Sequence, residues 1–307
     1  MGRGGKAAPV EATLPTCLIA HADRAPEDVF LEVWDEEEGV ELRMTYKQLA
    51  DCMLSGAQWL RAAVGLQQGD FCAMLAHNSA AYLSISFGAM ALGAISLNLN
   101  WRQPDSTTRT LLEDLGPKVL VASKPFKATA TAMHKAVGIK MVLLESICSP
   151  TGLPFQPPAP AEATALREEI NAMATSGGSN MTAAVFFTGG TTGTPKAVPH
   201  THHSLLWLAE QQRQLFPEPF GDDVPNAGTI CFTPFFHVRC ARATCALGGA
   251  FASSPPPTSP PPTPFLPPHL SPAHPTLPPH TSPVHPRTSP HLPSPFPPPR
   301  RAVPLCR

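Results

Sequence analysis

Residues 183–206 read AAVFFTGGTTGTPKAVPHTHHSLL, an apolar run followed by a loop dense in glycine and threonine and then by a lysine. The run Ala183–Phe187 predicts a buried strand, and a helix is expected to begin near Thr201 or His202. Glycines let a backbone approach phosphate closely, while exposed N–H groups and hydroxyls donate hydrogen bonds to it. A lysine adds positive charge. The pattern predicts a polyphosphate-binding loop, with ligand contacts from Thr188, Gly189, Gly190, Thr191, Thr192, Gly193, Thr194 and Lys196.

The spacing in this loop differs from that of two common nucleotide-binding motifs. In a Walker A loop the lysine follows a glycine directly, and Ser or Thr comes next. Here Thr194 and Pro195 precede Lys196, and Ala197 follows it. The dinucleotide fingerprint G-x-G-x-x-G is also absent. The loop therefore disfavours a GTPase, an ordinary P-loop ATPase or kinase, and a dinucleotide-binding domain.

The segments before the loop alternate between helical and strand patterns. Apolar residues at three- and four-residue steps predict an amphipathic helix from Thr45 to about Gly65. Short apolar runs at 118–122 and 140–144 predict buried strands, and a helical stretch at 107–115 precedes them. Because such alternation is typical of a largely parallel sheet, we expect an α/β lobe of layered sheets and helices over residues 14–252.

Two other segments need an interpretation of their own. Residues 71–101 contain no formally charged residue, but Ala, Gly, Ser and Asn are frequent among them. We therefore predict a helix at 80–92 that is buried in an α/β core and does not span a membrane. Residues 149–180 predict an irregular connection with one short helix at 162–174.

Overall composition excludes several classes of protein. The net charge of −1 over 307 residues is unlike that of a polycationic nucleic-acid binder or an acidic tail. The eight cysteines form no CxxC pair and no disulfide framework. A reducing, cytoplasmic location is the resulting expectation.

The C-terminal segment 253–307 has a different composition, with 22 of the 39 prolines and no acidic residue. It lacks the apolar surface needed to offset chain entropy, so we predict a disordered, low-complexity tail. Residues 295–300, PFPPPR, match the P-x-x-P-x-R pattern of ligands for SH3-type or WW-type domains.

Several segments together resemble a known family. TGGTTGTPKAVPHTH is similar to the phosphate-binding signature of the adenylate-forming (AMP-binding) superfamily, of the acyl-CoA synthetase type. TYKQLAD, AHNSAAYLSISFGAMALGAISLNLNWR, GPKVLVAS and TICFTPFFHV resemble other parts of the same family, in the same order. The resemblance covers about residues 14–238 and implies the N-terminal lobe of such an enzyme.

The resemblance also implies a reaction. A carboxylate attacks the α-phosphate of ATP, pyrophosphate leaves, and coenzyme A captures the acyl-adenylate as an acyl-CoA. ATP with Mg²⁺, coenzyme A and a small carboxylic acid are thus the implied ligands. Lys196 would stabilise charge on the leaving pyrophosphate, and His237 would stand beside the acyl pocket; these are the two catalytic residues that the resemblance implies.

The sequence departs from the family after Val238. The family's next β-structure is not recognisable in residues 238–257, and no segment resembles its adenine-binding strip, its ribose-binding aspartate or its C-terminal lysine domain. We therefore expect an acid–thiol ligase whose activity is impaired or lost in this 307-residue sequence. The alternative is a non-catalytic, truncated relative, or an interaction protein that acts through its proline-rich tail.

No metal-binding site is predicted from the histidines and cysteines. His200, His202 and His203 follow the phosphate loop as the family's sequence does, without need of a metal. His237, Cys240 and Cys245 lack a fourth ligand at a familiar spacing.

Overall fold

The computed structural model describes residues 12–34, 41–147, 155–188, 195–215, 228–231, 234–236 and 250–253. All of them belong to the first of the two units into which the chain divides, residues 1–258. Loop residues 189–194, His237, Cys240, Cys245 and residues 254–307 lie outside the described residues. The predicted disorder of the tail and its SH3-type or WW-type match therefore stay predictions.

The larger of two sheets confirms the predicted α/β fold. Its strands are β3 (Phe71–Leu75), β4 (Ile95–Asn98), β5 (Val119–Ala122), β6 (Lys140–Leu143), β7 (Thr182–Phe187) and β8 (Ala197–Thr201). They lie in the order β6-β5-β3-β4-β7-β8, and neighbours pair in parallel except for β7 and β8. All four residues of β5 are buried, as expected for a parallel strand covered on both faces.

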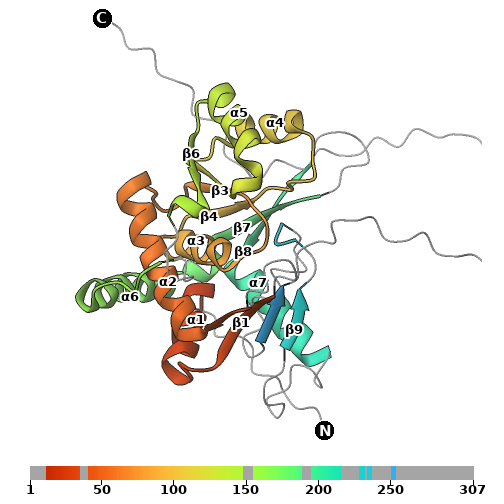
Figure 1. The fold of residues 1–307 in the computed structure, drawn as a ribbon. Coiled ribbons are helices and arrows are strands. Elements are labelled where there is room, and N and C mark those ends of the chain that lie inside the picture. Colours follow the sequence, from red (N-terminus) through yellow and green to blue (C-terminus); the bar gives the residue numbers. More distant parts are fainter. Residues whose placement is uncertain are drawn as a thin grey trace, which may run out of the picture. The chain divides into compact units, whose positions relative to one another are not determined.

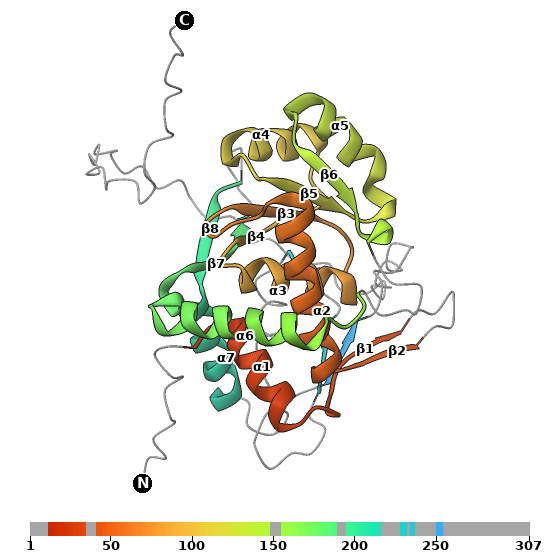
Figure 2. The same cartoon turned by 90° about the vertical axis from the view of Figure 1, so that its left-hand side faces the viewer.

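Helices cover both faces of this sheet (Figure 2). On one face lie α4 (Asp105–Leu115) and α5 (Lys127–Val137), and on the other lie α2 (Tyr46–Trp59) and α3 (Ala80–Ala91). Successive strand residues point to opposite faces. In β3, accordingly, Ala73 and Leu75 join the apolar cluster of α4 and α5, while Cys72 and Met74 join that of α2 and α3.

The smaller sheet has the order β2-β1-β10-β9 (Figure 1). Its strands are β1 (Val29–Trp34), β2 (Glu41–Thr45), β9 (Gly228–Cys231) and β10 (Ala250–Ser253). β10 pairs in parallel with both β1 and β9. It falls within residues 238–257, where no strand was predicted, because a four-residue run of Ala, Phe, Ala and Ser carries little β propensity.

The remaining helices are α1 (Leu14–Arg24), α6 (Pro160–Thr175) and α7 (His202–Leu215). Short 3₁₀ turns occupy Lys124–Phe126, Leu144–Ser146 and Gly178–Asn180. α6 has 16 residues, so it is longer than the short helix predicted between residues 162 and 174. The start of α7 at His202 agrees with the prediction.

The helix predicted from Thr45 to about Gly65 is confirmed. Thr45 caps α2, since its hydroxyl accepts a hydrogen bond from the Gln48 backbone N–H at 3.2 Å. The Gln48 side chain in turn accepts one from the Thr45 N–H at 2.9 Å, which completes a capping box. α2 continues as a π-helical turn, Leu60–Val64, and Gly65 ends it with φ +70°. Glycine takes this left-handed conformation without steric cost.

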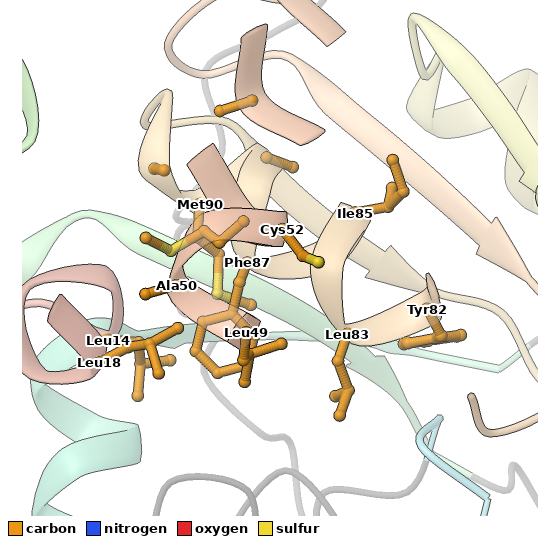
Figure 3. Packing of buried hydrophobic residues seen from close by; sticks show 14 of the residues in the cluster. Leu14, Leu18, Leu49, Ala50, Cys52, Tyr82, Leu83, Ile85, Phe87 and Met90 are labelled. Atoms are coloured by element: carbon orange, nitrogen blue, oxygen red, sulfur yellow. The ribbon is translucent and has the colours of Figure 1, made fainter. Parts of the chain in front are cut away.

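α3 is the centre of the main apolar core (Figure 3). Each of its residues except Ala81 is buried, which confirms the buried helix predicted near 80–92. It packs against α2 at two glycines, Gly56 and Gly88. Within the described ranges, no helix combines the length and the apolar character needed to cross a membrane.

Candidate active site

The two residues that flank the predicted phosphate loop, Thr188 and Lys196, lie at the carboxyl edge of the larger sheet. Because β3, β4, β5 and β7 run parallel, the segments that follow them meet at one edge. The chain leaves β3 toward α3 on one face, and leaves β4 and β5 toward α4 and α5 on the other. In open α/β sheets, ligands bind outside the carboxyl ends of the strands at such a reversal.

Two of the predicted phosphate-binding residues are adjacent in the structure. The Thr188 backbone N–H donates to the Lys196 carbonyl at 3.0 Å, and the Lys196 N–H donates to the Thr188 hydroxyl at 3.3 Å. Both residues are exposed. Thr188 and Lys196 thus close the neck of the loop, whose residues 189–194 are outside the described residues.

The lysine lies at the start of a strand. β8 begins at Ala197 and pairs antiparallel with β7, and α7 begins only after β8. The sequence pattern predicted the helix but not this strand, because Ala197–Thr201 contains Pro199 and only one aliphatic β-branched residue. The arrangement differs from a Walker A loop, in which the lysine opens a helix.

The short turn 234–236 reaches the same edge. The Phe235 N–H donates to the Asn78 side-chain oxygen at 2.7 Å, and Asn78 lies between β3 and α3. The Phe235 ring lies 5.2 Å from that of Tyr82, and the Phe236 ring lies 5.9 Å from that of Trp101. His237 follows Phe236 directly in the chain but is outside the described residues.

An aromatic cluster lies at the same edge of the sheet. His77, Trp101 and Phe126 follow β3, β4 and β5, and the His77 ring lies 4.8 Å from each of the other two. Burial lowers the pKa of His77, so its imidazole is neutral near pH 7. The guanidinium of Arg102 lies 4.8 Å above the Trp101 ring, in a cation–π contact.

A buried polar network supports β4, next to β7. The Tyr82 hydroxyl donates to the Asn98 side-chain oxygen at 2.5 Å, and the Ser96 hydroxyl donates to the same oxygen at 3.1 Å. Burial, and to a lesser degree the nearby Cys72, raises the pKa of Tyr82 far above its usual range, so this donor keeps its proton. The Asn98 amide donates to the Val185 carbonyl in β7 at 3.4 Å. The network therefore joins α3, β4 and the strand that leads to the loop.

A small cavity of about 40 Å³ adjoins this network. Tyr82, Ser86 and Asn98 give it a polar wall, and Phe186 and Phe235 are among its apolar walls. The cavity is therefore lined both by members of the network and by Phe235 of the turn 234–236.

The three histidines after the loop have different surroundings. His202 is buried, and its Nδ1 accepts a hydrogen bond from the Leu14 N–H at 3.2 Å. His203 is exposed, and the His200 ring lies 5.5 Å from that of Phe186. Each ring thus has its own environment, and within the described residues no group of three His, Cys, Asp or Glu side chains is placed to hold a metal.

Four residues at this site were not predicted from the sequence: Asn78, Tyr82, Asn98 and Trp101. All four lie in or next to the predicted apolar region 71–101, where they read as parts of a buried helix and its flanks. The one local signal is Asn78 with Ser79 between a strand and a helix, since such residues often cap helices. Ser79 does cap α3, and it accepts from the Tyr82 N–H at 3.1 Å.

A family model described as AMP-binding enzyme matches residues 18–267, which is most of the chain. The chain belongs to the AMP-binding enzyme family. The resemblance stated from the loop and its neighbours is thus confirmed.

Two of the curated proteins that the chain resembles are CoA ligases by name. The chain is 27% identical over 202 residues to long-chain-fatty-acid–CoA ligase FadD13 of Mycobacterium tuberculosis, covering 66% of this chain and 37% of that protein. It is 28% identical over 197 residues to 2-succinylbenzoate–CoA ligase of Oceanobacillus iheyensis, covering 64% and 36%. The chain thus spans little more than a third of the length of these relatives.

Solved structures of the AMP-binding family share the fold. The N-terminal domain of FACL13 from Mycobacterium tuberculosis gives a TM-score of 0.60 at 24% identity, over 80% of this chain and 57% of that one. VinN gives a TM-score of 0.61 at 17% identity, over 79% and 56%. The fold of the chain is that of the N-terminal domain of an adenylate-forming enzyme.

Proposed function

We propose that this chain carries the polyphosphate-binding part of an AMP-forming acid–thiol ligase. The observation that carries the proposal is the Thr188–Lys196 pair at the neck of a Gly/Thr loop, at the carboxyl edge of the larger sheet. Family membership supports the reaction class. The relatives named above are ligases for acids as different as a long-chain fatty acid and 2-succinylbenzoate, so the reaction class is proposed without a particular acid.

In the proposed reaction the carboxylate of the acid attacks the α-phosphorus of MgATP. An acyl–phosphate bond forms, the bond to the β-phosphate oxygen breaks, and magnesium pyrophosphate leaves. The thiolate of coenzyme A then attacks the acyl carbon and expels AMP. Negative charge grows on the leaving pyrophosphate, so an ammonium group and loop N–H donors aimed at it lower the barrier.

Lys196 is proposed to supply that ammonium group, and residues 188–194 the neutral donors. The exposure of Thr188 and Lys196 supports this, since both are accessible to a ligand above the edge of the sheet. His237 is proposed to stand beside the acid, because it directly follows the turn that packs on Tyr82 and Trp101.

The first test is polyphosphate binding by the Lys196→Ala variant. We expect a loss of affinity for MgATP and for pyrophosphate of about tenfold or more, because one charge-assisted contact is removed. Lys196→Arg should retain most of the binding. Isothermal titration or ³¹P NMR of the 307-residue chain measures both affinities.

The matched control is Lys118→Ala. Lys118 is also an exposed lysine, but it precedes β5 at the opposite edge of the sheet and pairs with Asp70 at 3.3 Å. This variant should bind MgATP as the unchanged chain does. An equal loss in both variants, or no saturable binding in the unchanged chain, would contradict the proposal.

The second test concerns catalysis by residues 1–307 alone. We expect no carboxylate-dependent exchange between ATP and labelled pyrophosphate, because no segment of these residues resembles the family's adenine- and ribose-binding motifs or its C-terminal lysine domain. A full-length ligase of the family serves as the positive control. Exchange at a comparable rate would show that these residues suffice for adenylation, against this part of the proposal.

A further inference from the structure

The backbone of the turn 234–236 is hydrogen-bonded to a side chain from a distant part of the chain. Asn78 accepts a hydrogen bond from the Phe235 N–H at 2.7 Å, although 157 positions separate the two residues. Phe235 and Phe236 are both buried, with 5% and 6% of their surfaces exposed. A backbone donor in such surroundings is costly to leave without an acceptor. The Asn78 oxygen is therefore a structural requirement of the turn as observed.

The position of Asn78 is itself well defined. His77, just before it, donates its backbone N–H to the Ser123 hydroxyl at 3.4 Å, which ties the segment to the end of β5. Ser79, just after it, caps α3. Asn78 thus stands between a parallel strand and a helix N-terminus that are both held in place.

Aromatic rings hold the turn from two further sides. Tyr82, in the first turn of α3 (Figure 3), is in contact with the Phe235 ring. Trp101, which follows β4, meets the Phe236 ring nearly edge-on at 85°. These two contacts orient the phenylalanine rings, while the Asn78 hydrogen bond holds the backbone of the turn at the edge of the sheet.

We propose that Asn78 is a positioning residue, which fixes the turn 234–236 at the candidate active site and, through the chain, constrains the next residue, His237. The role of His237 beside the acid rests on the proposed function, whereas the hydrogen bond between Asn78 and the turn does not. Asn78 acts through the Phe235 backbone and needs no contact with a substrate.

The first readout is hydrogen exchange at a single amide of the 307-residue chain. With ¹⁵N-phenylalanine labelling, and the Phe235 signal assigned from a Phe235→Leu variant, Asn78→Ala should speed exchange at the Phe235 amide by about tenfold, the loss expected for one hydrogen bond. Asn78→Asp retains an acceptor oxygen at the same reach and should restore the protection. Unchanged exchange in Asn78→Ala would overturn the proposal.

The matched control is Asn100→Ala. Asn100 follows β4 at the same edge, but its side chain accepts from the Arg102 N–H within its own turn. Its removal should leave the Phe235 amide unchanged. Should Asn78→Ala fail to fold, Asn78→Ser gives the same comparison, because its shorter side chain cannot span the distance to Phe235.

The second readout is the imidazole of His237. With ¹³C-labelled histidine, and the signal assigned from His237→Gln, we expect the His237 resonance to shift in Asn78→Ala and to return in Asn78→Asp. A general loss of stability would not be reversed selectively in this way. A His237 resonance that is identical in all three chains would overturn the positioning role.

These readouts are independent of the test of the proposed function. Lys196→Ala tests polyphosphate binding and leaves Asn78 untouched. If Lys196→Ala left polyphosphate binding unchanged while Asn78→Ala speeded hydrogen exchange at the Phe235 amide, only the ligase proposal would be refuted. If Lys196→Ala weakened polyphosphate binding while Asn78→Ala left that exchange unchanged, only the positioning role would be refuted.

Discussion

Replacing Gly88 by valine is expected to leave the chain unable to fold. A Cβ atom at this position would lie 2.8 Å from the Ala57 backbone nitrogen, 3.0 Å from the Gly56 carbonyl carbon and 3.1 Å from the Met53 carbonyl oxygen. All three are backbone atoms of α2, so no flexible side chain can move aside. α2 and α3 would have to separate across the centre of the main core.

The smaller substitution Gly88→Ala is expected to destabilise the chain by an amount that can be measured. Alanine favours a helix over glycine by about 1 kcal/mol, yet overpacking a core costs about 1–3 kcal/mol. Because the neighbours here are backbone atoms, we expect the collision to prevail and the free energy of unfolding to fall by about 2 kcal/mol. Urea denaturation followed by circular dichroism measures it, and solubility and proteolysis report on the valine variant.

The control is Ala165→Val on α6, an exposed position in the interior of a helix. It introduces the same β-branched residue without the contact with α2 and should cost less than about 1 kcal/mol. If Gly88→Ala were as stable as the unchanged chain, the close approach of α2 and α3 would be incorrect.

Acidification is expected to destabilise the chain through His202. Burial lowers the pKa of His202 to about 4 in the folded chain, against 6.5 when it is unfolded. Its Nδ1 must stay unprotonated to accept the Leu14 N–H, and it lies at the N-termini of both α1 and α7, where a positive charge is unfavourable.

The sign of the pH dependence follows from these two values. Below pH 6.5 the unfolded chain takes up a proton at His202 and the folded chain does not, so stability falls until about pH 4. A pKa difference of this size corresponds to about 3 kcal/mol. Above pH 6.5 the contribution of this group is constant.

His202→Asn isolates this contribution. The asparagine oxygen can accept the Leu14 N–H in place of Nδ1, but the side chain does not titrate. Urea unfolding between pH 7.5 and 4 should show a smaller loss of stability in the variant, by about 3 kcal/mol. The remaining slope includes His21 and His77, because burial also lowers the pKa of both. Equal slopes in the two chains would contradict the assignment to His202.

Pairs of site residues that are close together along the chain could be predicted from the sequence, and pairs that are far apart could not. Thr188 and Lys196 are eight residues apart, so the spacing of glycine, threonine and lysine was enough to predict that they belong to one loop, and the structure shows that they are hydrogen-bonded to each other. Asn78 and Phe235 are 157 positions apart, and Trp101 and Phe236 are likewise distant. No local pattern pairs them, because a side chain that accepts one hydrogen bond from a remote backbone leaves no periodic trace.

The sequence alone determined the local elements: the amphipathic helix that begins at Thr45, the buried helix α3 and the short apolar strands, while the phosphate loop stays a prediction. These follow from periodicity, capping and turn chemistry, which act over a few residues. Tertiary structure alone decided the strand order β6-β5-β3-β4-β7-β8, the antiparallel β8, the pairing of β10 with β1, and the meeting of Asn78 with Phe235. The physical reason is that strand partners and buried hydrogen bonds are chosen by which surfaces must leave water together, and that choice depends on the whole chain.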